Sequence, residues 1–266
     1  MSSPVDSSDI LVVEDLVQAF GGVKAVSGCS LSVPKAGITA LIGPNGAGKS
    51  TLINVVTGTY PVQHGRVTFD GHVINGWSMY RIAQLGLIRT FQISRDYGGM
   101  TVLENMLVPP QGQAGESLWN VFFRPKLVAA EEKRNLEKAL DRLNTFGIYE
   151  LRNEYARNLS GGQKRLLELA RALMAEPKLL LLDEPMAGVN PALADRLAQH
   201  ILELRDTGIS FLMVEHNLGI VDQMCKKVIV MAQGQTLATG TMEELRTNAD
   251  VVKAYLEGVT SGRTAS

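Results

Sequence analysis

A loop rich in glycine has the residue types that hold phosphate groups. Gly43-Pro-Asn-Gly-Ala-Gly-Lys-Ser50 fits the pattern G-x-x-x-x-G-K-[ST], after a predicted strand at Ile38–Ile42 and before a predicted helix. Its glycines let successive backbone N–H groups turn toward phosphate oxygens, and the positive end of the helix adds to the same field. Lys49 supplies a cation for the β- and γ-phosphates, and the Ser50 hydroxyl can bind Mg²⁺. The predicted phosphate-binding residues are Gly43, Pro44, Asn45, Gly46, Ala47, Gly48, Lys49, Ser50 and Thr51.

Two adjacent carboxylates follow a run of four leucines. Leu179–Leu182 predicts a buried strand, and Asp183 and Glu184 lie at its carboxyl end, where open α/β sheets bind ligands. Because unpaired charge is costly in a buried position, a cation explains the acid pair, with Asp183 holding Mg²⁺. Side chains alternate along a strand, so Glu184 is free to orient or deprotonate a water molecule. An exposed acidic turn before Pro185 is the alternative.

A second element with phosphate-binding chemistry lies at Ser160–Gln163. Ser160 at the N-cap and Gln163 three residues later form a predicted capping box, which opens a helix at 161–175. A helix N-terminus with two glycines and a serine can also receive a γ-phosphate, so both interpretations hold together. The second predicted phosphate-binding set is Ser160, Gly161, Gly162 and Gln163.

The stretch Leu159-Ser-Gly-Gly-Gln163 matches the signature sequence of ABC-type ATPases, and the chain resembles that family from about residue 9 to 258. The resemblance implies ATP and Mg²⁺ as cofactors. Gln92 resembles the glutamine that reaches the metal and the attacking water, and His216 resembles the histidine that contacts the γ-phosphate. Phe20 resembles the aromatic residue on which adenine stacks, with an ordinary core phenylalanine as the alternative. The predicted catalytic residues are Glu184, His216 and Gln92, and the predicted metal ligands are Ser50, Gln92 and Asp183.

Within this family the chain resembles in particular the ATP-binding subunits of branched-chain amino acid importers. The shared motifs are Phe20-Gly-Gly, Arg89-Thr-Phe-Gln92, Met100-Thr-Val-Leu-Glu-Asn105, Glu184-Pro-Met-Ala-Gly-Val-Asn-Pro191, Val214-Glu-His216 and Val252-Lys-Ala-Tyr-Leu256. The resemblance implies ATP hydrolysis in a head-to-tail dimer, with an identical or a different second ATPase, coupled to import through a permease. Urea, amide or other small-solute import and a non-transport ABC ATPase are the alternatives. Asn190 stands where many ABC proteins carry Asp.

Strands and helices alternate along the second half of the chain, which favours a parallel sheet covered by helices. Between Ile10 and Leu41, apolar stretches alternate with Gly and Pro, and we expect short strands and turns there. With the resemblance, the predicted fold class is α/β: a P-loop (RecA-like) parallel-sheet core with an N-terminal antiparallel β subdomain and an inserted α-helical subdomain. The predicted single domain spans 9–258, with a nucleotide-binding core at 9–92 and 159–240, a helical subdomain at 93–158, a C-terminal helix at 241–258, a disordered start at 1–8 and a flexible tail at 259–266.

The helical subdomain carries no evident catalytic group, and we expect it to form a groove for a short helix of the permease. Glu131–Phe146 has apolar residues three and four positions apart, which predicts an amphipathic helix. Before it, the segment Gln111–Ala130 carries Trp119, Phe122 and Phe123. We expect these aromatic residues to pack within the lobe rather than to bind a ligand.

The composition limits the partners. The 26 basic and 27 acidic residues nearly cancel, so nothing in the overall charge favours nucleic acid. The polar first nine residues predict no secretory signal, and no apolar run approaches the roughly 20 residues of a membrane helix. We therefore expect a cytoplasmic protein, peripheral on the inner face of the cell membrane, with Cys29 and Cys225 as buried free thiols.

Overall fold

The computed structural model describes residues 8–90, 97–110 and 118–261, which form two compact units. The first unit comprises residues up to 89, 178–185 and 201 onward, and the second comprises 90–177 and 186–200. The domain boundaries inferred from the sequence stay a prediction, and most of the predicted disordered start lies outside the described residues.

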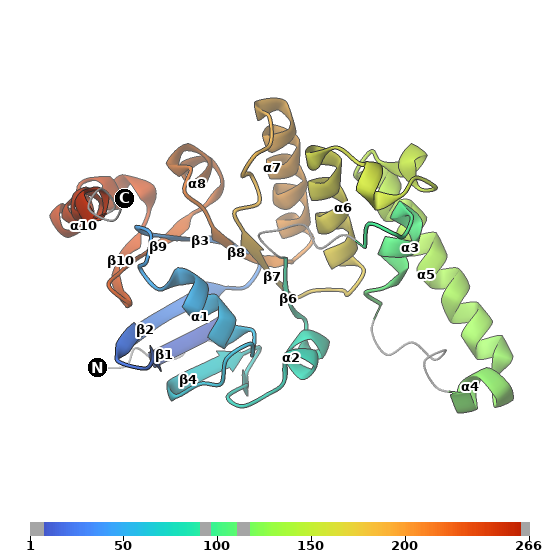
Figure 1. The fold of residues 1–266 in the computed structure, drawn as a ribbon, viewed down its shortest axis with the longest axis horizontal. Helices are drawn as coiled ribbons and strands as arrows, with labels where there is room; N and C mark the ends of the chain where they lie inside the picture. Colours follow the sequence, from blue (N-terminus) through green and yellow to red (C-terminus); the bar gives the residue numbers. More distant parts are fainter. Residues whose placement is uncertain (1–7, 91–96, 111–117, 262–266) are drawn as a thin grey trace. The chain divides into compact units, whose positions relative to one another are not determined.

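A six-stranded sheet forms the centre of the first unit (Figure 1). Its order is β10-β9-β3-β8-β7-β6, and all neighbours are parallel except β10, which pairs antiparallel with β9 at one edge. Every residue of β3, β7 and β8 is buried, as expected for parallel strands that are covered on both faces. The strands are β3 (Ile38–Ile42), β6 (Leu87–Arg89), β7 (Leu179–Asp183), β8 (Ser210–Val214), β9 (Lys227–Ala232) and β10 (Gln235–Gly240).

A second, antiparallel sheet has the order β2-β1-β4-β5 and confirms the predicted antiparallel element. The expectation of short strands before residue 41 was wrong, because β1 and β2 each contain 12 residues. Their pairing register shifts at several points, and Asp15 and Gly28 have positive φ angles of 47° and 90°. Such bulges interrupt the alternation of apolar and polar residues, which makes one long strand resemble several short ones. The strands are β1 (Asp9–Phe20), β2 (Val23–Pro34), β4 (His64–Phe69) and β5 (His72–Val73).

Two helices, of 5 and 13 residues, are found where the sequence predicts a single C-terminal helix at 241–258. Thr241 caps the first of them through a capping box with Glu244. The Asn248 side chain then accepts hydrogen bonds from the N–H groups of Asp250 and Val251, which starts a new helix. The helices of the first unit are α1 (Lys49–Val56), α2 (Met79–Leu85), α8 (Leu218–Met224), α9 (Met242–Arg246) and α10 (Ala249–Ser261).

The second unit is helical (Figure 1). The predicted amphipathic helix is confirmed as part of α5, which buries Ala139 and Leu143. Helix α7 begins in the second unit and ends in the first. The helices are α3 (Val102–Leu107), α4 (Leu118–Phe123), α5 (Pro125–Thr145), α6 (Gly161–Leu173) and α7 (Pro191–Asp206), with 3₁₀ turns at Tyr149–Leu151 and Ala156–Asn158.

The expectation that the aromatic residues before α5 pack within the lobe was wrong. Trp119, Phe122 and Phe123 are 67%, 75% and 65% exposed. They lie on α4, which is only six residues long and contacts the start of α5, so one short helix cannot bury all its aromatic side chains.

Both cysteines are buried and free, as predicted. Burial raises the pKa of the Cys29 thiol, and it raises that of Cys225 to about 12, so neither is a reactive thiolate at neutral pH. No helix in the described part of the chain is both long and apolar enough to cross a membrane.

Candidate functional site

Neighbouring strands bring Glu184 and His216, two of the predicted catalytic residues, to one edge of the parallel sheet. The order β3-β8-β7-β6 places the phosphate loop after β3, His216 after β8, and Asp183 at the end of β7. Because these strands are parallel, their carboxyl ends meet at the same edge, which is where such sheets bind ligands (Figure 1). At the end of β6 lies Arg89, to which the sequence analysis assigned no role.

The phosphate loop needs its glycines because other backbone segments approach it closely. A Cβ atom on Gly43 would collide with the carbonyl oxygen of Met231, and one on Gly48 would collide with that of Ala25. Gly48 is also the N-cap of α1 and has a left-handed φ of 97°. With no capping side chain at this position, the N–H groups of the first helical turn can bind an anion.

Lys49 is held within the loop. Its ammonium group is nearly buried and donates hydrogen bonds to the carbonyl oxygens of Gly43 and Pro44, at 2.8 Å and 3.0 Å. Burial lowers the pKa of Lys49, and the nearby carboxylates of Glu184 and Asp183 oppose that effect. A phosphate group at the loop is the partner that a partly desolvated cation favours.

Glu184 and His216 form a pair beside the loop. The Nε2 atom of His216 lies 3.1 Å from Oε1 of Glu184. Glu184 has a positive φ of 49°, and its N–H group donates to the carbonyl oxygen of Val214 at 2.9 Å. A left-handed backbone at a glutamate is strained, and such strain occurs often at functional sites. The Glu184 side chain is 24% exposed, so a water molecule can reach it.

Asp183 is held by a buried cation. Arg89 donates one hydrogen bond to Oδ2 of Asp183 at 3.0 Å and another to Oδ1 of Asn54 on α1 at 2.5 Å. The side chains of Arg89 and Asp183 are only 16% and 8% exposed. The arginine therefore joins the strand end that carries the acid pair to the helix that follows the phosphate loop.

The oxygen atoms available at this edge suit magnesium. Mg²⁺ prefers carboxylate, hydroxyl and water oxygens, and Asp183 and the exposed Ser50 supply the first two. The third predicted ligand, Gln92, lies outside the described residues, so its role as a metal ligand and catalytic residue stays a prediction.

Two aromatic residues of the first unit, Phe20 and Tyr255, belong to motifs that carry the family resemblance. Phe20, at the end of β1, is 45% exposed and lies edge-on to Tyr60, with ring centroids 5.1 Å apart. Its predicted role in stacking on adenine is compatible with this exposure and stays a prediction. Tyr255 on α10 contacts the backbone of Gly43, and burial raises its pKa to about 12. No role for Tyr255 was predicted from the sequence.

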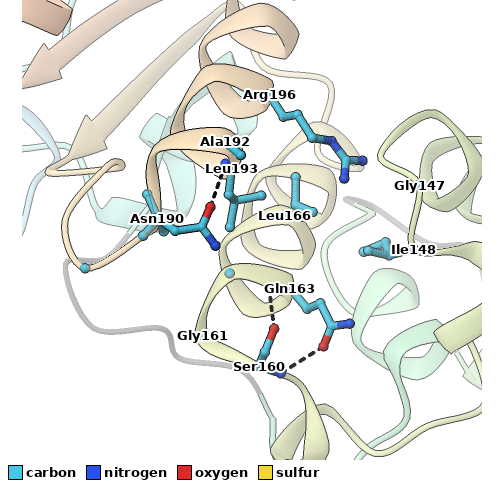
Figure 2. A pocket seen from close by; sticks show the side chains of 13 residues that line it. Gly147, Ile148, Ser160, Gly161, Gln163, Leu166, Asn190, Ala192, Leu193 and Arg196 are labelled. Carbon is cyan, nitrogen blue, oxygen red and sulfur yellow. Dashed lines mark hydrogen bonds between the residues drawn. The ribbon is translucent and has the colours of Figure 1, made fainter.

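In the second unit, the predicted second phosphate element lines a pocket of about 580 Å³ (Figure 2). Ser160 and Gln163 form the predicted capping box of α6: Ser160 Oγ accepts from the Gln163 N–H, and Gln163 Oε1 accepts from the Ser160 N–H. Since the Ser160 hydroxyl is exposed and acts as the acceptor in the cap, its own proton is available to an anion. The residues lining the pocket come from the 147–148 turn, α6, the 188–190 loop and α7.

Helix α7 contributes Arg196 and Leu193 to the lining of the pocket. Arg196 lines the same pocket and points toward Gly147, while Ser160 and the α6 N-terminus lie at the opposite end of the view (Figure 2). A Cβ atom on Gly162 would collide with Leu193, which explains this glycine by helix packing. Asn190 caps α7 by accepting a hydrogen bond from the Leu193 N–H at 2.9 Å, a task that Asn performs as well as Asp.

Comparison with known proteins identifies the family. The profile of the family described as "ABC transporter" matches residues 26–187, more than half of the chain. The chain belongs to the ABC transporter family. It is an ATP-binding cassette of that family, and its enzymatic activity is ATP hydrolysis.

The relatives of this ABC cassette match it over almost their whole length. It is 43% identical to the "probable branched-chain amino acid transport ATP-binding protein LivG" of Archaeoglobus fulgidus, over 93% of this chain and 95% of that protein. It is 39% identical to the "high-affinity branched-chain amino acid transport ATP-binding protein BraF" of Pseudomonas aeruginosa, over 94% and 98%.

Solved structures of ABC cassettes confirm the predicted fold. The chain is similar to a nucleotide-free ATP-binding cassette from an ABC transporter, with a TM-score of 0.80 and 41% identity over 93% of this chain and 98% of that one. The ADP conformation of an ATP-binding cassette of an ABC transporter matches with the same TM-score at 40% identity and the same coverage. The roles of individual site residues rest on the geometry described above.

Proposed function

We propose that this ABC cassette couples ATP hydrolysis to the import of branched-chain amino acids through a membrane permease. The observation that carries the hydrolytic part is the Glu184–His216 pair beside the phosphate loop. The solute is inferred from the names of the relatives. These are 37–43% identical to this chain, and the matches cover nearly the full length of this chain and of each relative.

Each residue at the sheet edge has a task in hydrolysis. The loop N–H groups and Lys49 bind the phosphates, and Glu184 orients and deprotonates the attacking water. His216 holds the Glu184 carboxylate and contacts the γ-phosphate, while Arg89 keeps Asp183 in position. Ser50, Asp183 and Gln92 would hold Mg²⁺, which would supply positive charge to neutralise the phosphates.

The pocket around Ser160 binds the γ-phosphate of a nucleotide on a second subunit. Its exposed helix N-terminus and Arg196 present positive charge to solvent, as a receptor for an anion brought by another molecule requires. Two subunits arranged head to tail then share two ATP molecules. The second subunit is a different ATPase in the transporter, and a copy of this chain can replace it in isolation.

The permease docks on residues 93–158, so the chain is peripheral on the inner face of the cell membrane. This segment lies in the sequence between Gln92, which is predicted to reach the metal and the attacking water, and Ser160. Movement of the segment with the nucleotide state would transmit that state to the permease.

Reconstitution with a membrane permease of a branched-chain amino acid transporter tests this function. In vesicles that also receive the matching solute-binding protein, we expect leucine uptake that requires ATP and stimulates turnover. Lys49→Ala should abolish both activities because it removes the cation of the phosphate loop. Turnover with uptake of urea or an amide instead of leucine would correct the solute, and turnover without any uptake would overturn the transport role.

A further inference from the structure

Helix α4 presents three aromatic side chains to solvent. Trp119, Phe122 and Phe123 are three and four positions apart, so they lie on one face of the helix. The rings of Trp119 and Phe123 contact each other, with centroids 4.1 Å apart. Leu127, in the first turn of α5, is 49% exposed and adds a fourth apolar side chain. We call these four residues the α4 patch.

The α4 patch is not part of the core of its unit. Helix α5 buries Ala139 and Leu143 in its second half, and Lys138 is tied there to Glu176 at 2.7 Å. The patch lies at the opposite, N-terminal end of α5, where Figure 1 shows α4. Exposure of large aromatic side chains in a group marks a surface that contacts something apolar.

The two charged residues within 118–130 are both basic, and the next charged residues along α5, Glu131 and Glu132, are acidic. Arg124 and Lys126 are exposed and directly follow the aromatic residues, and the sequence contains no acidic residue between 118 and 130. This local excess contrasts with the net charge of −1 for the whole chain. Exposed Trp and Phe beside Arg and Lys are the side chains that occupy the headgroup region of a bilayer, where apolar rings and anionic phosphates lie side by side.

We propose that the α4 patch rests in the headgroup layer of a membrane containing anionic lipid. This contact goes beyond the proposed transport function and does not depend on which solute is carried. A patch of four apolar side chains and two cations binds lipid weakly and reversibly. It therefore orients the helical unit against the membrane, whereas attachment of the chain comes from the permease.

The tryptophan content of the chain permits a direct test. Trp77 and Trp119 are its two tryptophans, so Trp77→Phe leaves Trp119 as the sole reporter. With vesicles of phosphatidylglycerol and phosphatidylcholine, we expect a blue shift of Trp119 emission and quenching by brominated acyl chains. Because each basic residue contributes to attraction by anionic lipid, affinity should fall roughly tenfold or more for pure phosphatidylcholine vesicles, and also in high salt.

Variants separate the apolar and the charged contributions. Phe122→Ser with Phe123→Ser should abolish the blue shift, and Arg124→Gln with Lys126→Gln should abolish the preference for anionic lipid. Lys133→Gln with Arg134→Gln is the matched control, since it removes the same charge from exposed positions two turns further along α5. The control should bind vesicles like the unmodified chain. ATP turnover in the absence of lipid should be the same in all of them.

Three results would overturn the proposal. The first is an unchanged Trp119 spectrum at millimolar lipid of either composition. The second is an equal loss of binding in the Lys133 and Arg134 control, which would show that general charge attracts the lipid. The third is burial of Trp119 by detergent-solubilised permease alone, with no response to vesicles, which would make the patch a protein-docking surface.

Discussion

The two phosphate-binding regions of this cassette differ in how far they are assembled within one chain. At the sheet edge of the first unit, Lys49, Asp183 and Glu184 are each held by groups of the same unit. Around Ser160 in the second unit, the capping box satisfies the helix start, and the hydroxyl and Arg196 face a pocket. This difference supports our proposal that hydrolytic chemistry resides in the first region and that the second receives the phosphate of another subunit.

The two regions also differ in how deeply their side chains are buried. Lys49 and Asp183 are each 7% exposed, so changes there affect folding as well as chemistry. Ser160 is exposed, so a change there affects function with little effect on folding.

The largest effect is expected for Glu184→Gln. Loss of the base should lower ATP turnover about 10²–10⁴-fold and leave ATP binding nearly unchanged, as a phosphate-release assay and nucleotide titration will measure. Glu176→Gln, at an exposed carboxylate paired with Lys138, is the control and should retain full turnover. Near-normal turnover in Glu184→Gln would assign the base role elsewhere, with His216 as the next candidate.

Ser160→Arg should lower turnover roughly 10²-fold, because a receptor for developing phosphate charge is lost and the larger side chain blocks closure. Binding of ATP to the separate chain should remain, since the sheet edge is intact. Thr241→Arg is the matched control because Thr241 also caps a helix through a capping box, in the first unit. If both variants lose turnover equally, the loss comes from capping rather than from the receptor.

Arg89→Gln should destabilise the first unit by about 3 kcal/mol, because it leaves the Asp183 carboxylate buried without its cation. Urea unfolding followed by circular dichroism will measure this. Arg205→Gln removes an exposed ion pair with Asp206 and should cost under about 1 kcal/mol. Equal effects of the two substitutions would contradict the positioning role of Arg89.

Asp70→Asn is expected to have the smallest effect, since it lies in a turn outside both regions. Hydrogen bonding to Lys178 at 2.6 Å lowers the pKa of Asp70 below its usual value of 3.8. Its stabilisation is therefore present above about pH 4 and is lost as the pH falls through the lowered pKa. The variant should be less stable by about 0.5 kcal/mol at pH 7, and the difference should vanish only once the pH is below the lowered pKa.

The parts of the fold that short-range patterns determine could be predicted from the sequence. The phosphate loop, the run Leu179–Leu182 and the capping box at Ser160 each depend on residues within eight positions of one another. The structure confirms the strand and the capping box, and it places the loop between β3 and α1.

The parts of the fold that depend on long-range contacts or on competing local signals could not be predicted from the sequence. Arg89 meets Asn54 and Asp183 across 35 and 94 positions, and no spacing rule connects them. The bulges of β1 and β2 hid two long strands behind an irregular apolar pattern. The exposure of Trp119 was missed because hydrophobicity alone predicts burial, whereas a six-residue helix at the end of a lobe has little to pack against.

Sedimentation of the Glu184→Gln protein with ATP and Mg²⁺ tests most directly the claim that a second subunit completes the site. With hydrolysis blocked, ATP should remain bound between the phosphate loop of one subunit and the Ser160 pocket of the other. We predict a dimer that requires both ATP and Ser160 and that dissociates when ADP replaces ATP. A monomer at high protein concentration, both alone and with the partner ATPase of its transporter, would contradict the account.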